Sequence, residues 1–371
     1  MLFPYKYINH EVEKFQKYSD FLFLDVWCKA SKPFSSKDLM KMPELKSIYE
    51  RLHNEDSDGA RFFNGHIESI YEDFRHLDKK DRDVLKSWYK LNNDISGLCK
   101  DRSLQPISYN KLIHAYPDLG KKIKSFYTKL YGSGSPFDLV AFGDFRLVIS
   151  RHYVEFMQIN DEEICPFCGI NSIKGVNHTK REAYDHFIPK AQYPFTSVNF
   201  KNLAPMCHEC NSSYKLSKEP LMHIDPITKK TLPLRRRAFY PYSSKKWDFQ
   251  TKVELTKTDI ENLTKADINI TFKTLDSYSH LDQIESWNET FGIDERYKAK
   301  ILGKRGAKKW FAEFLVLENM KKLEPDKEAT AKSLYEMKMK EINADPLDNG
   351  NFIKKAFLEE CTKKGLFSLN P

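Results

Sequence analysis

The spacing of apolar residues predicts helices along the N-terminal part of the chain. Apolar side chains recur three and four positions apart in residues 66–77 and again in residues 121–131, so each segment has one core-facing side. Asp78 stands where a further helix would begin, and the GSGSP stretch at 132–136 interrupts the helical pattern. We therefore expect residues 1–158 to form a helical scaffold, and this region carries no catalytic signature.

The C-terminal part mixes two periodicities. Apolar and polar residues alternate in residues 249–255 and 268–272, which predicts two paired strands. Helical spacing returns around Trp287 and again from Trp310. The predicted fold class is therefore α+β, with a helical N-terminal region (1–158), a central region that contains four of the seven cysteines (159–220) and an α+β C-terminal region (221–371).

Composition excludes disordered and membrane-spanning classes. Hydrophobic residues make up 40% and charged residues 30% of the chain, with 26 Phe and 19 Tyr, as in a well-packed globular protein. The most apolar early segment, FLFLDVW at 21–27, is interrupted by Asp25 and lacks the layout of a signal peptide. We expect a cytoplasmic protein without a membrane partner, in which clustered cysteines are reduced and bind metal.

Two Cys-x-x-C pairs predict a zinc site. CPFCG (165–169) and CHEC (207–210) each place two thiolates on one side of a tight turn, and two such turns complete a tetrahedral shell. A redox role would explain one pair but not two. We predict structural zinc on Cys165, Cys168, Cys207 and Cys210. The remaining cysteines, Cys28, Cys99 and Cys361, are interpreted as buried or incidental thiols.

Polar residues between and after these pairs are candidates for catalysis. Asp185 and His186 are adjacent, Asn202 follows, and Asn211 comes directly after Cys210. Neighbouring residues in a strand point to opposite faces, so Asp185 and His186 share a site only where the strand twists, bulges or ends. Structural alternatives are a core histidine, a turn aspartate, and an asparagine that caps a loop.

Four motifs, CPFCG, YDHFIP, NLAPMC and CHECNSSYK, resemble in this order the HNH endonucleases whose ββα-metal motif is braced by a four-cysteine zinc. The resemblance implies that His186 is the general base and that Asn202 orients it. It also implies that Asp185 and Asn211 hold one Mg²⁺ or Mn²⁺. Many members have a histidine where this chain has Asn211, and the amide oxygen favours a hard ion such as Mg²⁺.

A basic segment follows the last motif. Basic residues outnumber acidic ones between Lys215 and Lys246, and RRRAFYPY interleaves them with aromatic residues. Together with the net charge of +8, this favours a nucleic-acid partner. A solvated basic loop is the alternative, and a second basic run, GKRGAKKW at 303–310, gives a weaker signal. The predicted nucleic-acid contacts are Lys215, Lys218, Arg235, Arg236 and Arg237.

The flanks of the central region resemble those of effector nucleases from prokaryotic anti-phage defence. DHFIPK, NLAPMC and CN, followed by FYPY, are similar to the HNH component of Septu systems, which acts with an ATPase partner. The resemblance implies metal-dependent hydrolysis of DNA together with a protein partner. Three alternatives stay open. An RNA substrate such as tRNA would use the same site. A stand-alone restriction-type nuclease should carry a recognition element such as a helix-turn-helix, and none is found. A non-enzymatic zinc module would only bind nucleic acid or protein.

Overall fold

The computed structural model describes residues 1–225, 227–228, 230–247, 249–274, 280–323 and 328–367. The chain folds into two compact units, each discontinuous in sequence. The N-terminal unit comprises Pro4–Glu163 and Ile173–Lys245, and the C-terminal unit comprises Met1–Phe3, Ile164–Ser172 and Lys246–Pro371. Both helices and small antiparallel sheets are present, so the predicted α+β class is confirmed.

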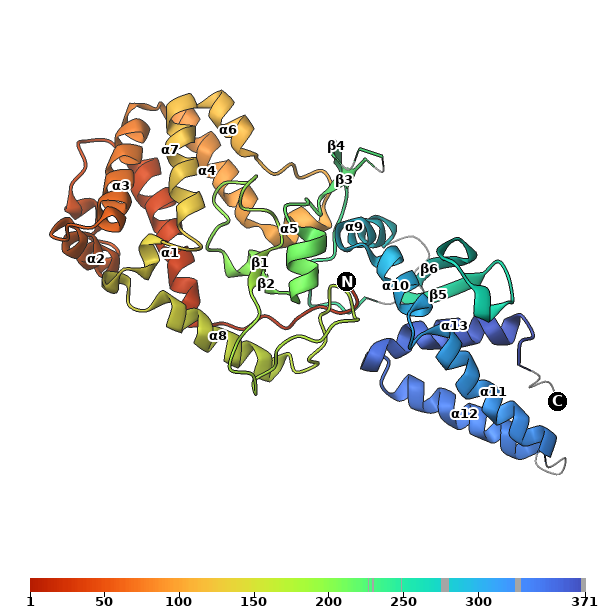
Figure 1. Ribbon diagram of the computed structural model, residues 1–371. Coiled ribbons are helices and arrows are strands. Elements are labelled where there is room, and N and C mark those ends of the chain that lie inside the picture. The colour runs from red at the N-terminus through yellow and green to blue at the C-terminus, as the bar shows by residue number, and fades with distance from the viewer. Residues whose placement is uncertain (226, 229, 248, 275–279, 324–327, 368–371) are drawn as a thin grey trace. The chain divides into compact units, whose positions relative to one another are not determined.

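Helices dominate the N-terminal unit up to residue 159, as predicted (Figure 1). The apolar side of residues 66–77 lies in the core, with Ile67, Ile70 and Phe74 fully buried. The side chain of Asp78 accepts a hydrogen bond from the Asp81 N–H at 2.7 Å and so begins the helix that follows. The helices are α1 (Lys14–Phe21), α2 (Pro43–His53), α3 (Asp58–His76), α4 (Lys79–Asn93), α5 (Ile95–Lys100), α6 (Tyr109–Ala115), α7 (Pro117–Lys129) and α8 (Phe145–Ile159).

Two short hairpins complete the N-terminal unit. Strand β1 (Tyr184–His186) pairs antiparallel with β2 (Leu203–Pro205), and β3 (Met222–Ile224) pairs antiparallel with β4 (Thr231–Arg235). Between β2 and β3 lies a π-helix, Cys210–Lys215. The order of hairpin and helix is therefore β1, β2 and then the π-helix.

The helical scaffold holds the loop that joins β1 to β2. Phe195 of this loop is fully buried and contacts the rings of Phe23, Tyr89 and Tyr127, with ring centroids 5.0 to 5.3 Å apart. Its φ of 78° is unusual for a bulky residue and costs energy, which the surrounding aromatic packing offsets. The helices thus fix the position of the residues directly after Phe195.

The C-terminal unit contains the predicted strand pair. Strands β5 (Phe249–Leu255) and β6 (Ile268–Thr274) are antiparallel, with Val253 opposite Ile270, and this prediction is confirmed. The helices of this unit are α9 (Leu281–Phe291), α10 (Ile293–Leu302), α11 (Ala307–Leu323), α12 (Glu328–Ala344) and α13 (Asn351–Lys363). In the parts of the chain that the structure describes, no helix has the length and apolar character needed to cross a bilayer.

Candidate active site and zinc centre

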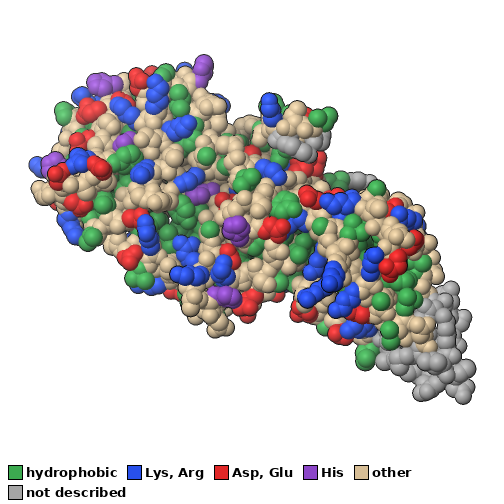
Figure 2. Space-filling model, viewed as in Figure 1, with side chains coloured by type: hydrophobic (Ala, Val, Ile, Leu, Met, Phe, Trp, Pro, Cys, Tyr) green, Lys and Arg blue, Asp and Glu red, His purple; other side chains and the backbone are tan. Residues whose placement is uncertain are grey.

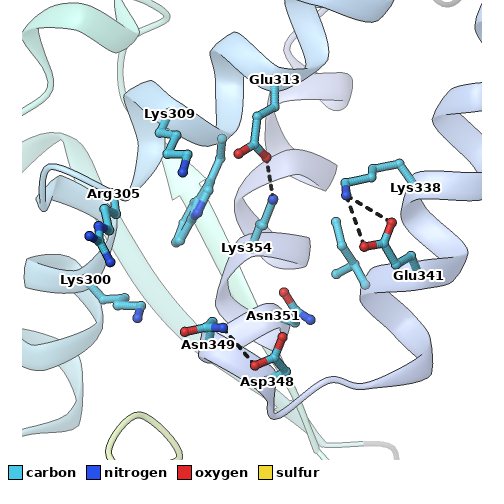
Figure 3. A pocket seen from close by; sticks show the side chains of 12 residues that line it. Lys300, Arg305, Lys309, Glu313, Lys338, Glu341, Asp348, Asn349, Asn351 and Lys354 are labelled. Carbon is cyan, nitrogen blue, oxygen red and sulfur yellow. Dashed lines mark hydrogen bonds and ion pairs between the residues drawn. The ribbon is translucent and has the colours of Figure 1, made fainter.

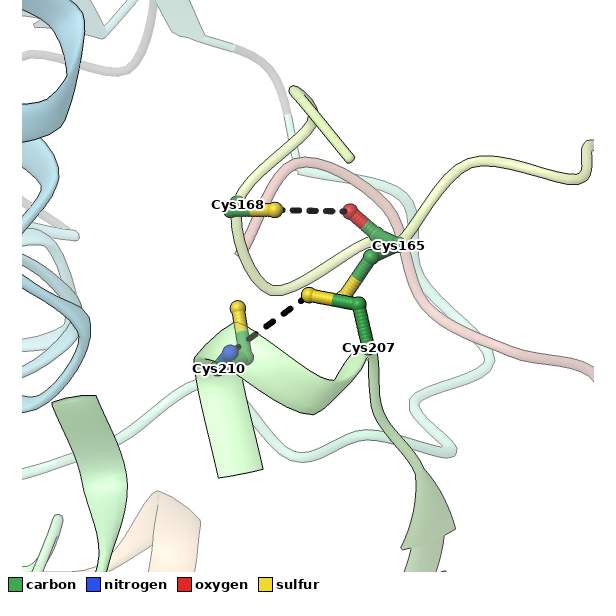
Figure 4. Close-up of side chains that lie close together, drawn as sticks. All are labelled: Cys165, Cys168, Cys207 and Cys210. Atoms are coloured by element: carbon green, nitrogen blue, oxygen red, sulfur yellow. Dashed lines mark hydrogen bonds between the residues drawn. The ribbon is translucent and has the colours of Figure 1, made fainter. Parts of the chain in front are cut away.

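The four cysteines of the two Cys-x-x-C pairs come together in one buried cluster (Figure 4). The Sγ atoms of Cys165, Cys168, Cys207 and Cys210 all lie within 4.8 Å of one another. Four thiolates at this spacing match the donor set and number of a closed tetrahedral zinc site, with no position left for a catalytic water. The cluster can therefore bind zinc, and its chemistry is that of a structural centre.

The first cysteine turn is shaped by a glycine and packed by aromatic residues. Gly169 has a φ of 66°, and its N–H donates to the carbonyl of Cys165 at 2.7 Å. The indole N–H of Trp287 donates to the carbonyl of Phe167 at 2.6 Å, and the Tyr297 hydroxyl donates to the carbonyl of Cys168 at 3.0 Å. These hydrogen bonds attach the turn to α9 and α10 of the C-terminal unit.

The lone cysteines are unlike the cluster. Among the described residues, Cys28, Cys99 and Cys361 belong to no metal-binding group. Burial raises the pKa of Cys28 and Cys361 to about 12 and raises the pKa of Cys99 further still. These thiols stay protonated near neutral pH, in line with their interpretation as buried or incidental.

Strand β1 ends at His186, the position where a shared site with Asp185 was predicted to require a strand end. The His186 side chain is buried and its Nε2 lies 2.8 Å from the Ser197 carbonyl oxygen. A carbonyl oxygen only accepts, so Nε2 carries the proton and, in the neutral ring, Nδ1 carries the lone pair. Burial lowers the pKa of His186 to about 3, with Lys190 and Lys215 adding to the effect. The ring is therefore neutral at pH 7.

Asn202 fixes the chain directly after His186. Its side-chain oxygen accepts from the Ile188 N–H at 2.8 Å, and its amide nitrogen donates to the Ile188 carbonyl at 2.9 Å. The Phe187 N–H donates to the backbone carbonyl of Asn202 at 2.7 Å. Both functional groups of a buried amide are thus satisfied by one residue, which holds the end of β1 in place.

Lys215 links the π-helix to the end of β1. Its Nζ lies 2.8 Å from the Asp185 carboxylate and donates to the His186 carbonyl at 2.8 Å, and the side chain is fully buried. Lys215 is therefore not a solvated residue of the basic segment. Because Asn211 lies on the same short helix, one turn earlier, the helix that carries Asn211 packs against the strand that carries Asp185. A π-helix is rare and often marks a functional site.

The donors offered by Asp185 and Asn211 fit a hard divalent ion. They are carboxylate and amide oxygens, which suit Mg²⁺ and Mn²⁺. The Asp185 side chain keeps 17% of its surface exposed, and its Oδ2 faces Lys215, so its other oxygen is the one left for an ion. The neutral His186 ring adds no positive charge, whereas the Lys215 ammonium, 2.8 Å from Oδ2, competes with an ion for the Asp185 carboxylate.

The basic segment is less exposed than the sequence predicted. Lys215, Arg235 and Arg236 are all buried, so their predicted contact with phosphate finds no support here. The Arg235 guanidinium donates to the carbonyls of Leu98 and Leu221 at 2.7 and 2.8 Å. Lys218 and Arg237 are half-buried.

Two contacts of the site were missed by sequence reasoning. The Tyr131 ring packs edge-on against His186, with centroids 4.9 Å apart and planes at 90°. Tyr131 directly precedes the GSGSP stretch, so its aromatic character next to a loop was a weak signal. The Ser197 carbonyl had no signal, because every residue has one.

The chain is similar in part to two curated proteins. A segment of 66 residues, 18% of this chain, is 41% identical to Protein ea31 of Escherichia phage lambda and covers 20% of it. A second match, 128 residues long and 32% of this chain, is 29% identical to Septu protein PtuB of Bacillus thuringiensis. That match covers 47% of PtuB, so this chain spans a fifth to about half of its relatives. No family model and no solved structure matches.

A buried histidine beneath β1 makes stability depend on pH. Burial lowers the pKa of His152 to about 3, and its ring contacts the Tyr184 hydroxyl. The unfolded chain, with a histidine pKa of about 6.5, takes up the proton first, so stability is complete above that pH and falls as pH drops toward 3. We expect the lowered pKa of His152 to reduce the free energy of unfolding by about 2 kcal/mol at pH 5 relative to pH 7. Urea unfolding of wild type and His152→Gln at pH 5 and pH 7 measures this reduction. An equal loss of unfolding free energy in the two proteins would contradict the prediction.

Proposed function

We propose that this protein is a metal-dependent HNH-type endonuclease that hydrolyses DNA and acts in anti-phage defence together with an ATPase partner. The partial similarity to Septu protein PtuB supports the defence role. The observation that best supports the proposed chemistry is the position of the Lys215 ammonium, 2.8 Å from both the Asp185 carboxylate and the His186 carbonyl. This contact joins the strand bearing the proposed base to the helix bearing Asn211.

In the proposed reaction His186 takes a proton from water at Nδ1. The Ser197 carbonyl holds the Nε2 proton, so the tautomer is set before substrate binds. Tyr131 restricts the ring from one side. Asn202 keeps β1 from extending past His186, so the ring stays at the strand end. An ion on Asp185 and Asn211 would supply positive charge to stabilise the phosphate as negative charge develops on it.

Lys215 acts in this proposal as a positioning residue. Buried between a carboxylate and a carbonyl, its ammonium fixes the Asp185 side chain and the π-helix relative to each other. It does not face solvent, and its charge is already matched by Asp185. A role in holding the site is therefore favoured over the contact with phosphate that the sequence indicated.

Replacing Lys215 tests that role. Lys215→Met should cost about 3 kcal/mol of unfolding free energy, because removing one partner of a buried pair leaves the other uncompensated. The maximal cleavage rate should fall while the dissociation constant for DNA in Ca²⁺ changes less than twofold. Lys201→Met, at an exposed lysine, is the matched control and should leave stability unchanged. A weakened DNA affinity with a normal maximal rate would instead make Lys215 a phosphate contact.

Cleavage assays test the proposed function itself. The purified protein, alone and with the product of the neighbouring gene, is incubated with plasmid DNA and with total RNA in Mg²⁺ or Mn²⁺. We expect cleavage of plasmid that stops in EDTA. Cleavage of RNA alone would move the substrate to RNA, and binding without cleavage under every condition would favour a non-enzymatic zinc module.

A further inference from the structure

The C-terminal unit contains a polar pocket of about 410 Å³ (Figure 3). Its walls come from the end of α10, the start of α11, the helix α12 and the turn that precedes α13. This volume lies in the range of small-molecule sites, which is about 300–1,000 Å³. The pocket belongs to the C-terminal unit and the candidate active site to the N-terminal unit, so a ligand in the pocket is independent of the proposed function.

One side of the pocket is neutralised by its own ion pairs. Lys354 lies 2.7 Å from the Glu313 carboxylate, and Lys338 lies 3.0 Å from that of Glu341. The Lys354–Glu313 pair joins α13 to α11, whereas Lys338 and Glu341 lie three residues apart on α12 (Figure 3). These four side chains stabilise the wall and leave little net charge there.

The rest of the wall carries three cations and one carboxylate, that of Asp348, which forms no ion pair among the described residues. Lys300, Arg305 and Lys309 line it, and within the described chain none of them forms an ion pair or a side-chain hydrogen bond. Figure 3 places the three on the same side of the pocket. They belong to the GKRGAKKW run and the residues before it, and the first turn of α11 contains no acidic residue. Three cations held together repel one another unless an anion lies between them.

We propose that this pocket binds a small phosphorylated molecule through Lys300, Arg305 and Lys309. The planar Arg305 guanidinium matches two phosphate oxygens at once, and the two ammonium groups add charge from either side. Three cations outnumber the one free carboxylate of the wall, Asp348, so the remaining positive charge fits a ligand with two or more negative charges, such as a pyrophosphate group, better than a single carboxylate. A concave pocket walled by Trp310 suits a compact ligand more than a continuous nucleic-acid backbone.

The phosphate could come from a free nucleotide or from the end of a nucleic-acid strand, and titration calorimetry on the full chain separates the two. The probes are inorganic pyrophosphate, ATP, and a short oligonucleotide with and without a 5′-phosphate. We expect pyrophosphate and ATP to bind. Binding of the 5′-phosphorylated oligonucleotide, but not of the unphosphorylated one, would identify a strand end as the source of the phosphate. Binding of the unphosphorylated oligonucleotide alone would overturn the proposal in favour of a backbone-binding surface.

Charge-removing variants with a matched control locate the binding. Lys309→Gln and Arg305→Gln should each weaken pyrophosphate binding about tenfold, as expected for losing one charge-assisted hydrogen bond. Lys308→Gln should leave the affinity unchanged, because Lys308 does not line the pocket and pairs with Glu261 at 3.2 Å. Equal weakening by Lys308→Gln and Lys309→Gln, or no binding by wild type at millimolar pyrophosphate, would overturn the site. Unfolding temperatures confirm that the variants are folded.

Discussion

Replacing His186 with glutamine should reduce nucleic-acid cleavage by at least about 100-fold, the usual contribution of a general base. Glutamine can still donate a hydrogen bond to the Ser197 carbonyl, as His186 Nε2 does, but it has no basic nitrogen. The variant therefore separates the loss of the base from the loss of packing. Single-turnover cleavage of plasmid DNA, with wild type and variant at equal concentration, measures the effect.

His208→Gln is the matched control for this experiment. His208 lies in the same unit but its side chain is exposed, and it directly follows a cysteine of the cluster. The cleavage rate of this variant should equal that of wild type. A His186→Gln protein that is folded and cleaves at the wild-type rate would remove His186 from the mechanism, and the base would then have to be sought elsewhere.

Local patterns in the sequence predicted the helices, the strand pair and the cysteine cluster. Periodic apolar residues such as Ile67, Ile70 and Phe74 report burial directly, because helix geometry places them on one side. The two Cys-x-x-C pairs were informative for a different reason, since few arrangements other than a metal site bring four thiolates together.

Side-chain burial of charged residues was not predictable in the same way. Lys215, Arg235 and Arg236 looked like a basic surface because a run of cations is normally solvated. In the fold each finds carbonyl or carboxylate oxygens supplied by distant parts of the chain, such as Leu98 for Arg235 and Asp185 for Lys215. Such partners depend on tertiary structure, which a local sequence pattern does not contain.

The candidate site also depends on a backbone atom that sequence cannot single out. The Ser197 carbonyl sets the tautomer of His186, and its position follows from Phe195, whose left-handed conformation is held by three aromatic rings of the helical scaffold. The N-terminal helices, which carry no catalytic signature, therefore contribute to the site through packing.

Removing zinc should unfold the region around the π-helix and abolish cleavage. Zinc binding to a four-cysteine site contributes about 10–16 kcal/mol at neutral pH, which equals or exceeds the typical stability of a whole domain. Cys210 is the first residue of the π-helix that carries Asn211 and Lys215, so its release frees the start of that helix. We expect Cys210→Ala to lose its zinc and to show a lower unfolding temperature and faster proteolysis near residue 210.

Cys28→Ala is the control, because Cys28 is half-buried and lies outside the cluster. It should keep one zinc per chain, measured by atomic absorption, and its unfolding temperature should change by no more than a few degrees. Cleavage by the Cys28 variant should match wild type. If Cys210→Ala instead retained full zinc and full stability, the four-cysteine cluster would not be a structural metal centre, and the π-helix would have to be held by packing and by the Lys215 contacts alone.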